Sequence, residues 1–219
     1  MTFSQSLLEL KRIPLNIDKS FYVVLVLLPF ANILFNGWGL GLTSFLILPF
    51  VFLFALLHEY GHCWAAIMSG YRVRGIKLWF LGGLATIECV NNLPPKQEIF
   101  ISALGPATNF LLMIPFIFLS CIFGINPLFS AAVAINLVLG VFNLIPAFPM
   151  DGGRILRAIL HYYTGNMRDG TILAAKAGIL ISGLMILLGS ITANFMLVMI
   201  FGWVGMICYS TIQDPGSIA

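Results

Sequence analysis

Six long segments of the chain are almost free of charged side chains, and they constrain its fold more than any other feature. A helix needs about 20 mostly apolar residues to cross the hydrocarbon core of a bilayer. Charged residues make up 9% of this chain, against about 25% in a typical soluble domain, so a water-soluble fold cannot bury its apolar surface. We therefore predict an all-α membrane protein with six transmembrane helices at Phe21–Phe35, Leu42–Met68, Ile99–Phe123, Phe129–Ile145, Ile172–Leu188 and Phe195–Thr211.

The positions of the lysine and arginine residues predict how these helices are oriented. Ten of the eleven lie before the first span, between the second and third, or after the fourth, and Lys176 can reach the interface from the start of the fifth. Positive charge collects on the cytoplasmic side of a membrane. We therefore expect a multi-pass protein of the cell membrane with both termini cytoplasmic. Its net charge of +3 gives no reason to expect a nucleic-acid partner.

Two stretches on the predicted cytoplasmic side have the periodicity of strands. Ile13, Leu15 and Ile17 alternate with proline and polar residues, and Arg72–Val90 holds β-branched and aromatic residues around Gly82–Gly83. This pattern predicts a small interfacial β-sheet, with an irregular loop as the alternative. Because no repeat or linker interrupts the chain, we expect residues 1–219 to form a single domain.

The second span contains the motif His58-Glu59-Tyr60-Gly61-His62. Residues four apart on a helix share a face, so both imidazoles can reach one metal ion, and Glu59 can take a proton from a water on that metal. This is the HExxH pattern of zinc metalloproteases. The alternative is a pair of structural histidines with Glu59 paired to a base. It must account for three ionisable side chains in a membrane helix, each costing about 2.5 kcal/mol or more.

A catalytic zinc ion usually has three protein ligands and a water, so one ligand remains to be found. Asp151 is the best candidate, because Pro146 and Pro149 break the fourth span before it and Gly152–Gly153 free the backbone after it. Irregular backbone at membrane depth is tolerated where it is buried in protein or lines a wet cavity. We predict one Zn²⁺ per chain with Asp151 as the third ligand. A helix-capping or arginine-paired aspartate is the alternative.

Other polar residues are weaker candidates for metal binding. Cys63 points about 100° around the helix from His62 and is assigned to packing. We expect a polar stripe on a short interfacial helix to be solvated, and it comprises Arg154, Arg157 and His161. Two further acidic residues lie in the charged connections, namely Glu88 and Asp169.

These motifs resemble those of the site-2 protease family of intramembrane zinc metalloproteases. The resemblance rests on HEYGH in one span and NLIPAFPMDGG at the end of a later one. Two further stretches match family motifs, namely Ser102–Asn109 and Phe80–Gly83. The similarity extends over nearly the whole chain. The resemblance implies that His58, His62 and Asp151 bind zinc and that Glu59 is the general base. Asn143 matches a family asparagine that helps to hold the substrate or the developing oxyanion. An interhelical hydrogen bond is the alternative for Asn143, and Asn109 is expected to do structural work.

The resemblance also implies a reaction and its partners. The expected reaction is regulated intramembrane proteolysis, in which a peptide bond within or near the transmembrane segment of a single-span protein is hydrolysed after another protease has shortened that protein. The chain lacks the PDZ-like and nucleotide-sensing domains of many relatives, so we expect a minimal catalytic core. The main alternative is a metal-ion transporter that uses the buried His/Asp cluster. A transporter, however, predicts ligands at several depths, whereas this sequence has one cluster.

Overall fold

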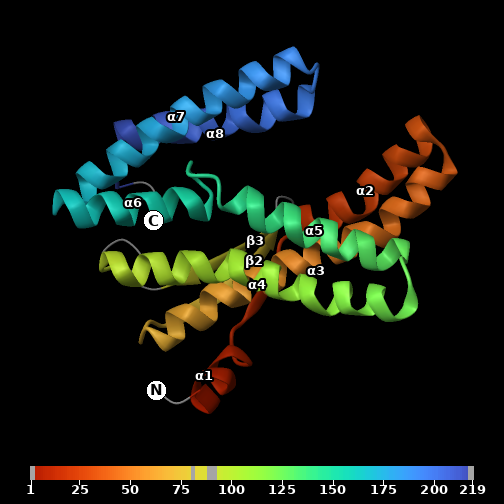
Figure 1. Ribbon diagram of the computed structural model, residues 1–219, viewed down its shortest axis with the longest axis horizontal. Coiled ribbons are helices and arrows are strands. Elements are labelled where there is room, and N and C mark those ends of the chain that lie inside the picture. The colour runs from red at the N-terminus through yellow and green to blue at the C-terminus, as the bar shows by residue number, and fades with distance from the viewer. Residues whose placement is uncertain (1–2, 80–81, 88–92, 217–219) are drawn as a thin grey trace. The chain divides into compact units, whose positions relative to one another are not determined.

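The computed structural model describes residues 3–79, 82–87 and 93–216 (Figure 1). The chain divides into two compact units, Met1–Glu88 with Leu104–Gly140 and Cys89–Ala103 with Val141–Ala219. In chain order the elements are α1 (Phe3–Leu10), β1 (Leu15–Ile17), α2 (Lys19–Asn36), α3 (Trp38–Met68), β2 (Val73–Trp79), β3 (Gly82–Ile87), α4 (Pro95–Phe123), α5 (Pro127–Asn143), α6 (Asp151–Thr164), α7 (Met167–Ile191) and α8 (Phe195–Gln213). That the whole chain forms a single domain stays a prediction.

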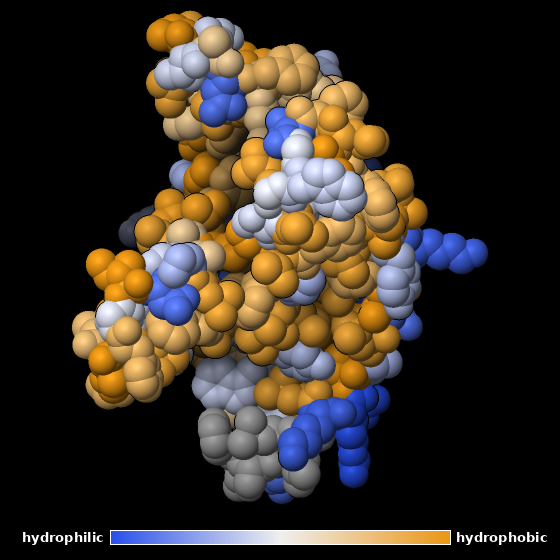
Figure 2. Space-filling model, turned by 90° about the vertical axis from the view of Figure 1, so that its right-hand side faces the viewer, coloured by the Kyte–Doolittle hydropathy of each residue, from blue (hydrophilic) through white to orange (hydrophobic). Residues whose placement is uncertain are grey.

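Within the described residues, five helices are long and apolar enough to cross a membrane, namely α2, α3, α4, α7 and α8. The helix α5 is apolar but has 17 residues. These six helices coincide with the six predicted spans, so the predicted fold class is confirmed. Hydrophobic residues cover most of the face shown in Figure 2. Large apolar side chains such as Leu180 and Ile114 are 66% and 59% exposed, as lipid-facing residues should be.

In the first unit, Asp18 joins the start of α2 to the sheet. Its side chain accepts hydrogen bonds from the Ser20 amide at 3.0 Å and the Ser20 hydroxyl at 2.8 Å, and it pairs with Lys77 of β2 at 3.1 Å. These contacts, the backbone hydrogen bond foremost, lower the pKa of Asp18 from 3.8 to about 2. The stabilising contribution of this carboxylate is therefore present above pH 3.8 and is lost as the pH falls through about 2.

The predicted sheet has three strands in the order β1, β2, β3. Leu15 of β1 lies opposite Ile76 in a parallel pair, and Ile76 lies opposite Ala85 of β3 in an antiparallel pair. The two strands expected within Arg72–Val90 are thus confirmed, although residues 80–81 and 88–90, including Glu88, lie outside the described residues. The strand β3 stands at one edge of the sheet and contacts α3.

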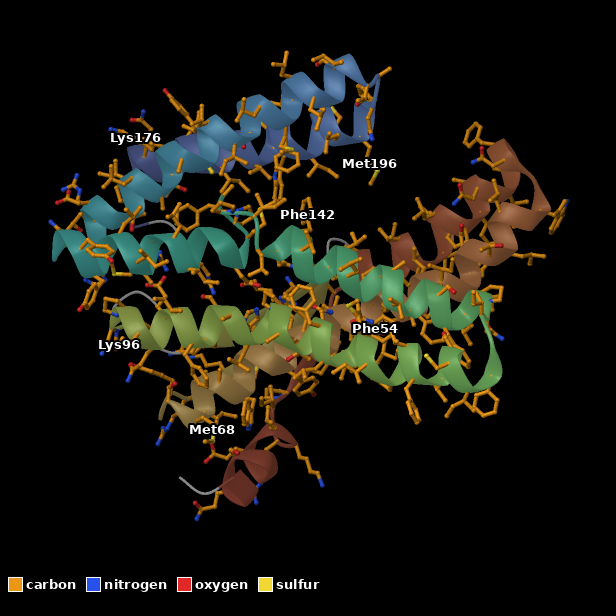
Figure 3. The ribbon with its side chains drawn as sticks, in the orientation of Figure 1. Phe54, Met68, Lys96, Phe142, Lys176 and Met196 are labelled. Carbon is orange, nitrogen blue, oxygen red and sulfur yellow. The ribbon has the colours of Figure 1, made fainter. Side chains whose placement is uncertain are left out.

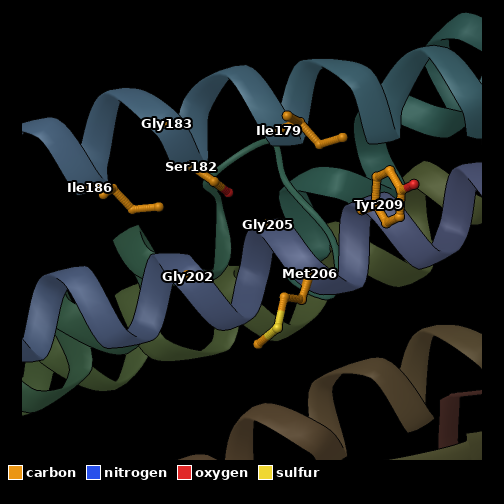
Figure 4. Close-up of a pocket in the computed structure, with 8 residues that line it drawn as sticks. All are labelled: Ile179, Ser182, Gly183, Ile186, Gly202, Gly205, Met206 and Tyr209. Carbon is orange, nitrogen blue, oxygen red and sulfur yellow. The ribbon is translucent and has the colours of Figure 1, made fainter.

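In the second unit, α7 and α8 lie side by side (Figure 1). Between them is an open pocket of about 400 Å³, into which Ser182 points from α7 towards Gly205 of α8 (Figure 4). Gly183 and Gly202 line this space, where an added Cβ would meet nothing within 4 Å. Lys176 is exposed on α7 (Figure 3), and that its side chain reaches the interface stays a prediction.

A buried ion pair joins α4 to α6 within the second unit. Arg157 donates a hydrogen bond from Nε to Glu98 Oε1 at 2.7 Å, and these residues are 1% and 2% exposed. The Arg157 guanidinium also lies 5.7 Å from the centre of the Phe148 ring. The expectation of a solvated position is therefore wrong for Arg157, because Glu98 supplies the partner that lets the charge be buried.

Candidate metal centre

His58 and His62 lie on one face of α3 and are both buried. Their Nε2 atoms are 3.1 Å apart, and the planes of the rings meet at 83°. Two nitrogen ligands of a tetrahedral zinc ion are about 3.3 Å apart when each zinc–nitrogen bond is about 2.0–2.1 Å. The two nitrogens are therefore spaced as neighbouring ligands of one zinc ion.

Two glycines allow α3 and α4 to approach closely at this point. A Cβ on Gly61 would overlap Thr108 Oγ1 and lie 2.6 Å from the Leu104 carbonyl oxygen. A Cβ on Gly105 would overlap His62 Nε2 and lie 2.7 Å from His58 Nε2. Residues without a side chain are favoured where membrane helices cross closely. A glycine at residue 105 thus keeps a side chain away from both imidazole nitrogens, as a metal bound to them would require.

Asn109 of α4 holds the second ring nitrogen of His58. His58 Nδ1 lies 2.6 Å from Asn109 Oδ1, and Asn109 is fully buried. Because a carboxamide oxygen only accepts hydrogen bonds, Nδ1 carries the hydrogen and Nε2 keeps the lone pair that a metal needs. The sequence predicts structural work for Asn109 and does not indicate this contact. One available signal was its spacing of four from Gly105, which places both on the same face of α4.

Glu59 extends from α3 to the edge of the sheet. The Ala85 N–H of β3 donates a hydrogen bond to Glu59 Oε2 at 2.9 Å. Gly83 makes room for this carboxylate, since a Cβ there would overlap Glu59 Cγ and lie 3.3 Å from Glu59 Cδ. The predicted general base therefore has a fixed position beside His58, and a glycine of the sheet makes that position possible.

Asp151 is the first residue of α6, in the second unit, and it is 7% exposed. The N-cap of α6 is Met150, so Asp151 is not the capping residue that the alternative interpretation suggests. Asn143 is the half-buried last residue of α5. The roles of Asp151 and Asn143 stay predictions.

The two glycines after Asp151 do not free the backbone, contrary to the prediction from the sequence. Gly152 and Gly153 lie buried in the first turn of α6 and do not interrupt it. A Cβ on Gly152 would overlap the carbonyl oxygens of Leu144 and Ile145, and one on Gly153 would lie 2.7 Å from the carbonyl carbon of Ala147. The glycines are therefore needed because the preceding turn packs directly on the helix, and they hold Asp151 in a compact segment.

The other candidates considered as ligands lie on α3, α6 and α7, apart from Glu88, which is outside the described residues. Cys63 is fully buried, as its predicted packing role requires, and Asp169 is exposed in the first turn of α7. His161 is half-buried on α6 in the second unit.

The family model described as Peptidase family M50 matches residues 45–126 and 120–189, which include the HExxH motif and Asp151. The chain belongs to peptidase family M50. This M50 chain is 35% identical over 206 residues to a zinc metalloprotease of Methanocaldococcus jannaschii, a match that covers 91% of the chain and 58% of the relative. A Synechocystis relative is 33% identical over 186 residues and is covered to 48% of its length. The chain thus spans about half the length of these curated relatives.

A solved structure gives the same relationship. The M50 chain matches the site-2 protease from Methanocaldococcus jannaschii with a TM-score of 0.69 and 32% sequence identity, over 91% of each chain. The resemblance to the site-2 protease family is therefore confirmed, and so is the prediction of a multi-pass membrane protein. Zinc is the metal in the name of the M. jannaschii metalloprotease, and it is the metal that the histidine pair fits.

Proposed function

We propose that this M50 chain is an intramembrane zinc metalloprotease that hydrolyses a peptide bond within or near the transmembrane segment of single-span membrane proteins. The observation that carries the proposal is a pair of buried histidine nitrogens beside a glutamate whose carboxylate is held at a sheet edge. A metal-ion transporter would need the histidines, but it leaves Glu59 without a role.

The predicted catalytic residues suggest how the reaction proceeds. Zinc, when bound, acts as a Lewis acid and supplies a water that ionises near neutral pH. Glu59 takes the proton from this water and later gives it to the leaving amine. The hydrogen bond from Ala85 orients the carboxylate for both transfers. We assign Asn143 to donate a hydrogen bond to the substrate carbonyl oxygen, where negative charge develops.

Asp151 is proposed as the third zinc ligand, giving one Zn²⁺ per chain. A catalytic zinc site usually has three protein ligands, and the first unit provides two of them. Three features of Asp151 support the assignment. It is buried, it lies within the family match, and the turn before it packs tightly on Gly152 and Gly153. A carboxylate held in this way has few conformations to lose when it binds a metal.

Asp151→Asn should weaken zinc binding by about 10- to 100-fold, because an amide oxygen is a poorer zinc ligand than a carboxylate. Zinc content and zinc affinity would be measured on protein purified in detergent, together with cleavage of a labelled single-span substrate. Asp169→Asn is the matched control, since Asp169 also lies in the first turn of a helix but is exposed.

The outcomes separate the competing functions. The protease and the third ligand are supported if wild type holds about one zinc per chain and cleaves the substrate, and if Asp151→Asn impairs that cleavage. Unchanged zinc affinity in Asp151→Asn would overturn the ligand assignment. If wild type holds zinc, cuts nothing in detergent or lipid, and moves zinc across vesicle membranes, the transporter is correct.

We propose that the substrate unwinds and adds as a strand to the outer edge of β3. Two observations support this mode of capture: β3 is an edge strand, and its Ala85 N–H points out of the sheet, to Glu59. An added strand would bring its backbone next to the general base. Strand addition also exposes peptide carbonyls that a helix keeps hydrogen-bonded.

Ala85→Pro should lower cleavage by about tenfold, because it removes the edge hydrogen bond, worth about 1 kcal/mol or more, that holds Glu59 beside the added strand. Proline is tolerated at an outward-facing position of an edge strand, so the sheet and the bound zinc should persist. Steady-state cleavage and zinc content would be compared with those of Ala85→Val, which keeps the N–H. Equal cleavage by the two variants would argue against a general base held at the edge of β3, and with it against capture of the substrate there.

We also propose that both termini and the sheet face the cytoplasm and that the substrates are already shortened by another protease. The distribution of lysine and arginine supports the orientation, and family membership supports the substrate class. Labelling of tags at each end from either side of the membrane tests the orientation. Comparison of full-length and truncated substrates tests the requirement for prior cleavage.

A further inference from the structure

A buried chain of hydrogen bonds runs from the main chain of α5 to the zinc-binding histidine. The Asn136 amide nitrogen donates to the Ala132 carbonyl oxygen at 2.9 Å, and the Asn109 amide nitrogen donates to Asn136 Oδ1 at 3.0 Å. Asn109 Oδ1 then lies 2.6 Å from His58 Nδ1. Both asparagines are fully buried, so water does not compete for these groups.

The chain has only one consistent direction. A backbone carbonyl accepts but cannot donate, so Asn136 must turn its NH₂ group towards Ala132 and its oxygen towards Asn109. Asn109 must then present its NH₂ group to that oxygen and its own oxygen to His58. An amide oxygen also cannot donate, so the hydrogen must lie on His58 Nδ1. A main-chain carbonyl thus determines which nitrogen of the histidine carries its lone pair.

We propose that Asn109 and Asn136 are positioning residues that hold His58 in the Nδ1–H tautomer and fix its ring with Nε2 towards the metal. The inference rests on the proposed zinc site, and it adds Asn136, which does not touch the histidine. A histidine that binds zinc through one ring nitrogen commonly has its other ring nitrogen hydrogen-bonded. Loss of that hydrogen-bond partner weakens metal binding by about 10- to 100-fold.

Without Asn136, the Asn109 amide can turn over. It would then present NH₂ to His58 Nδ1, which favours the Nε2–H tautomer and removes the lone pair that zinc needs. Asn136→Leu should therefore lower zinc affinity by about tenfold. Asn136→Asp should retain it, because a neutral carboxylic acid of the same shape can donate to Ala132 and accept from Asn109.

The test combines two readouts that do not depend on cleavage. The first is zinc affinity of Asn136→Leu and Asn136→Asp. The second is the tautomer of His58 in zinc-free protein, read from the nitrogen NMR shifts of isotopically labelled histidine. With three histidines in the chain, His161→Gln and His62→Gln assign the signals. Asn32→Leu is the matched control, since it breaks another interhelical side-chain hydrogen bond, to Ser44 at 2.8 Å, away from His58.

We expect wild type, Asn136→Asp and Asn32→Leu to show the Nδ1–H tautomer and similar zinc affinity, and Asn136→Leu to lose both. If Asn136→Leu does not fold, Asn109→Leu in zinc-free protein should still lose the fixed tautomer. Wild-type zinc affinity and an unchanged tautomer in Asn136→Leu would overturn the inference. A fixed tautomer in a wild-type protein that binds no zinc would leave the hydrogen-bond chain intact and overturn the proposed function instead.

Discussion

Glu59→Gln should leave zinc bound and lower the rate of cleavage by at least about 1,000-fold, within the range for loss of a general base. The glutamine oxygen can accept the hydrogen bond that Ala85 now donates to Glu59 Oε2 at 2.9 Å, so the side chain should keep its position. What it loses is the ability to take a proton from water and return it to the leaving amine. Single-turnover cleavage and zinc content, measured on the same preparation, check this expectation.

The matched control for this prediction is Glu9→Gln on α1. Glu9 is exposed, so its substitution removes the same charge from the chain without affecting the histidine pair. This control should cleave at the wild-type rate. If Glu59→Gln also cleaved at that rate, Glu59 would not be the general base. If it lost its zinc, the carboxylate would be needed for the metal site itself.

The membrane helices could be predicted from the sequence because an apolar segment of sufficient length has few other stable environments. The strands could be predicted from the alternation of apolar and polar residues, which specifies the two faces of a strand but not the strand it pairs with. The parallel pairing of β1 with β2 therefore could not be deduced, since Leu15–Ile17 has three residues and no turn links it to Val73–Trp79.

The metal motif was predictable because its two histidines are neighbours on one helix, and their spacing alone brings them together. The errors and omissions concern contacts between distant parts of the sequence. The partner of Arg157 is Glu98, 59 positions away, and the partner of His58 is Asn109, 51 positions away. Local patterns contain no information on such pairs, so the sequence predicts a solvated position for Arg157 and does not indicate the contact of Asn109 with His58.

Gly105→Ala should lower zinc affinity by more than about 100-fold, although alanine is the better helix former by about 1 kcal/mol. The new Cβ would overlap His62 Nε2 and lie 2.7 Å from His58 Nε2, in the space that a metal ion needs. The His58 ring cannot turn away without breaking its 2.6 Å contact with Asn109. Zinc titration and thermal unfolding of the zinc-free protein would measure the two effects separately.

The control for this variant is Gly183→Ala on α7, where an added Cβ meets nothing within 4 Å. Both substitutions place a methyl group in the interior of a long helix, so both should raise the intrinsic helix preference. Only Gly105→Ala should lose zinc and cleavage, while the zinc-free forms of both remain folded. Full zinc binding by Gly105→Ala would mean that the metal lies elsewhere than in front of the two Nε2 atoms, and the proposed centre would be wrong.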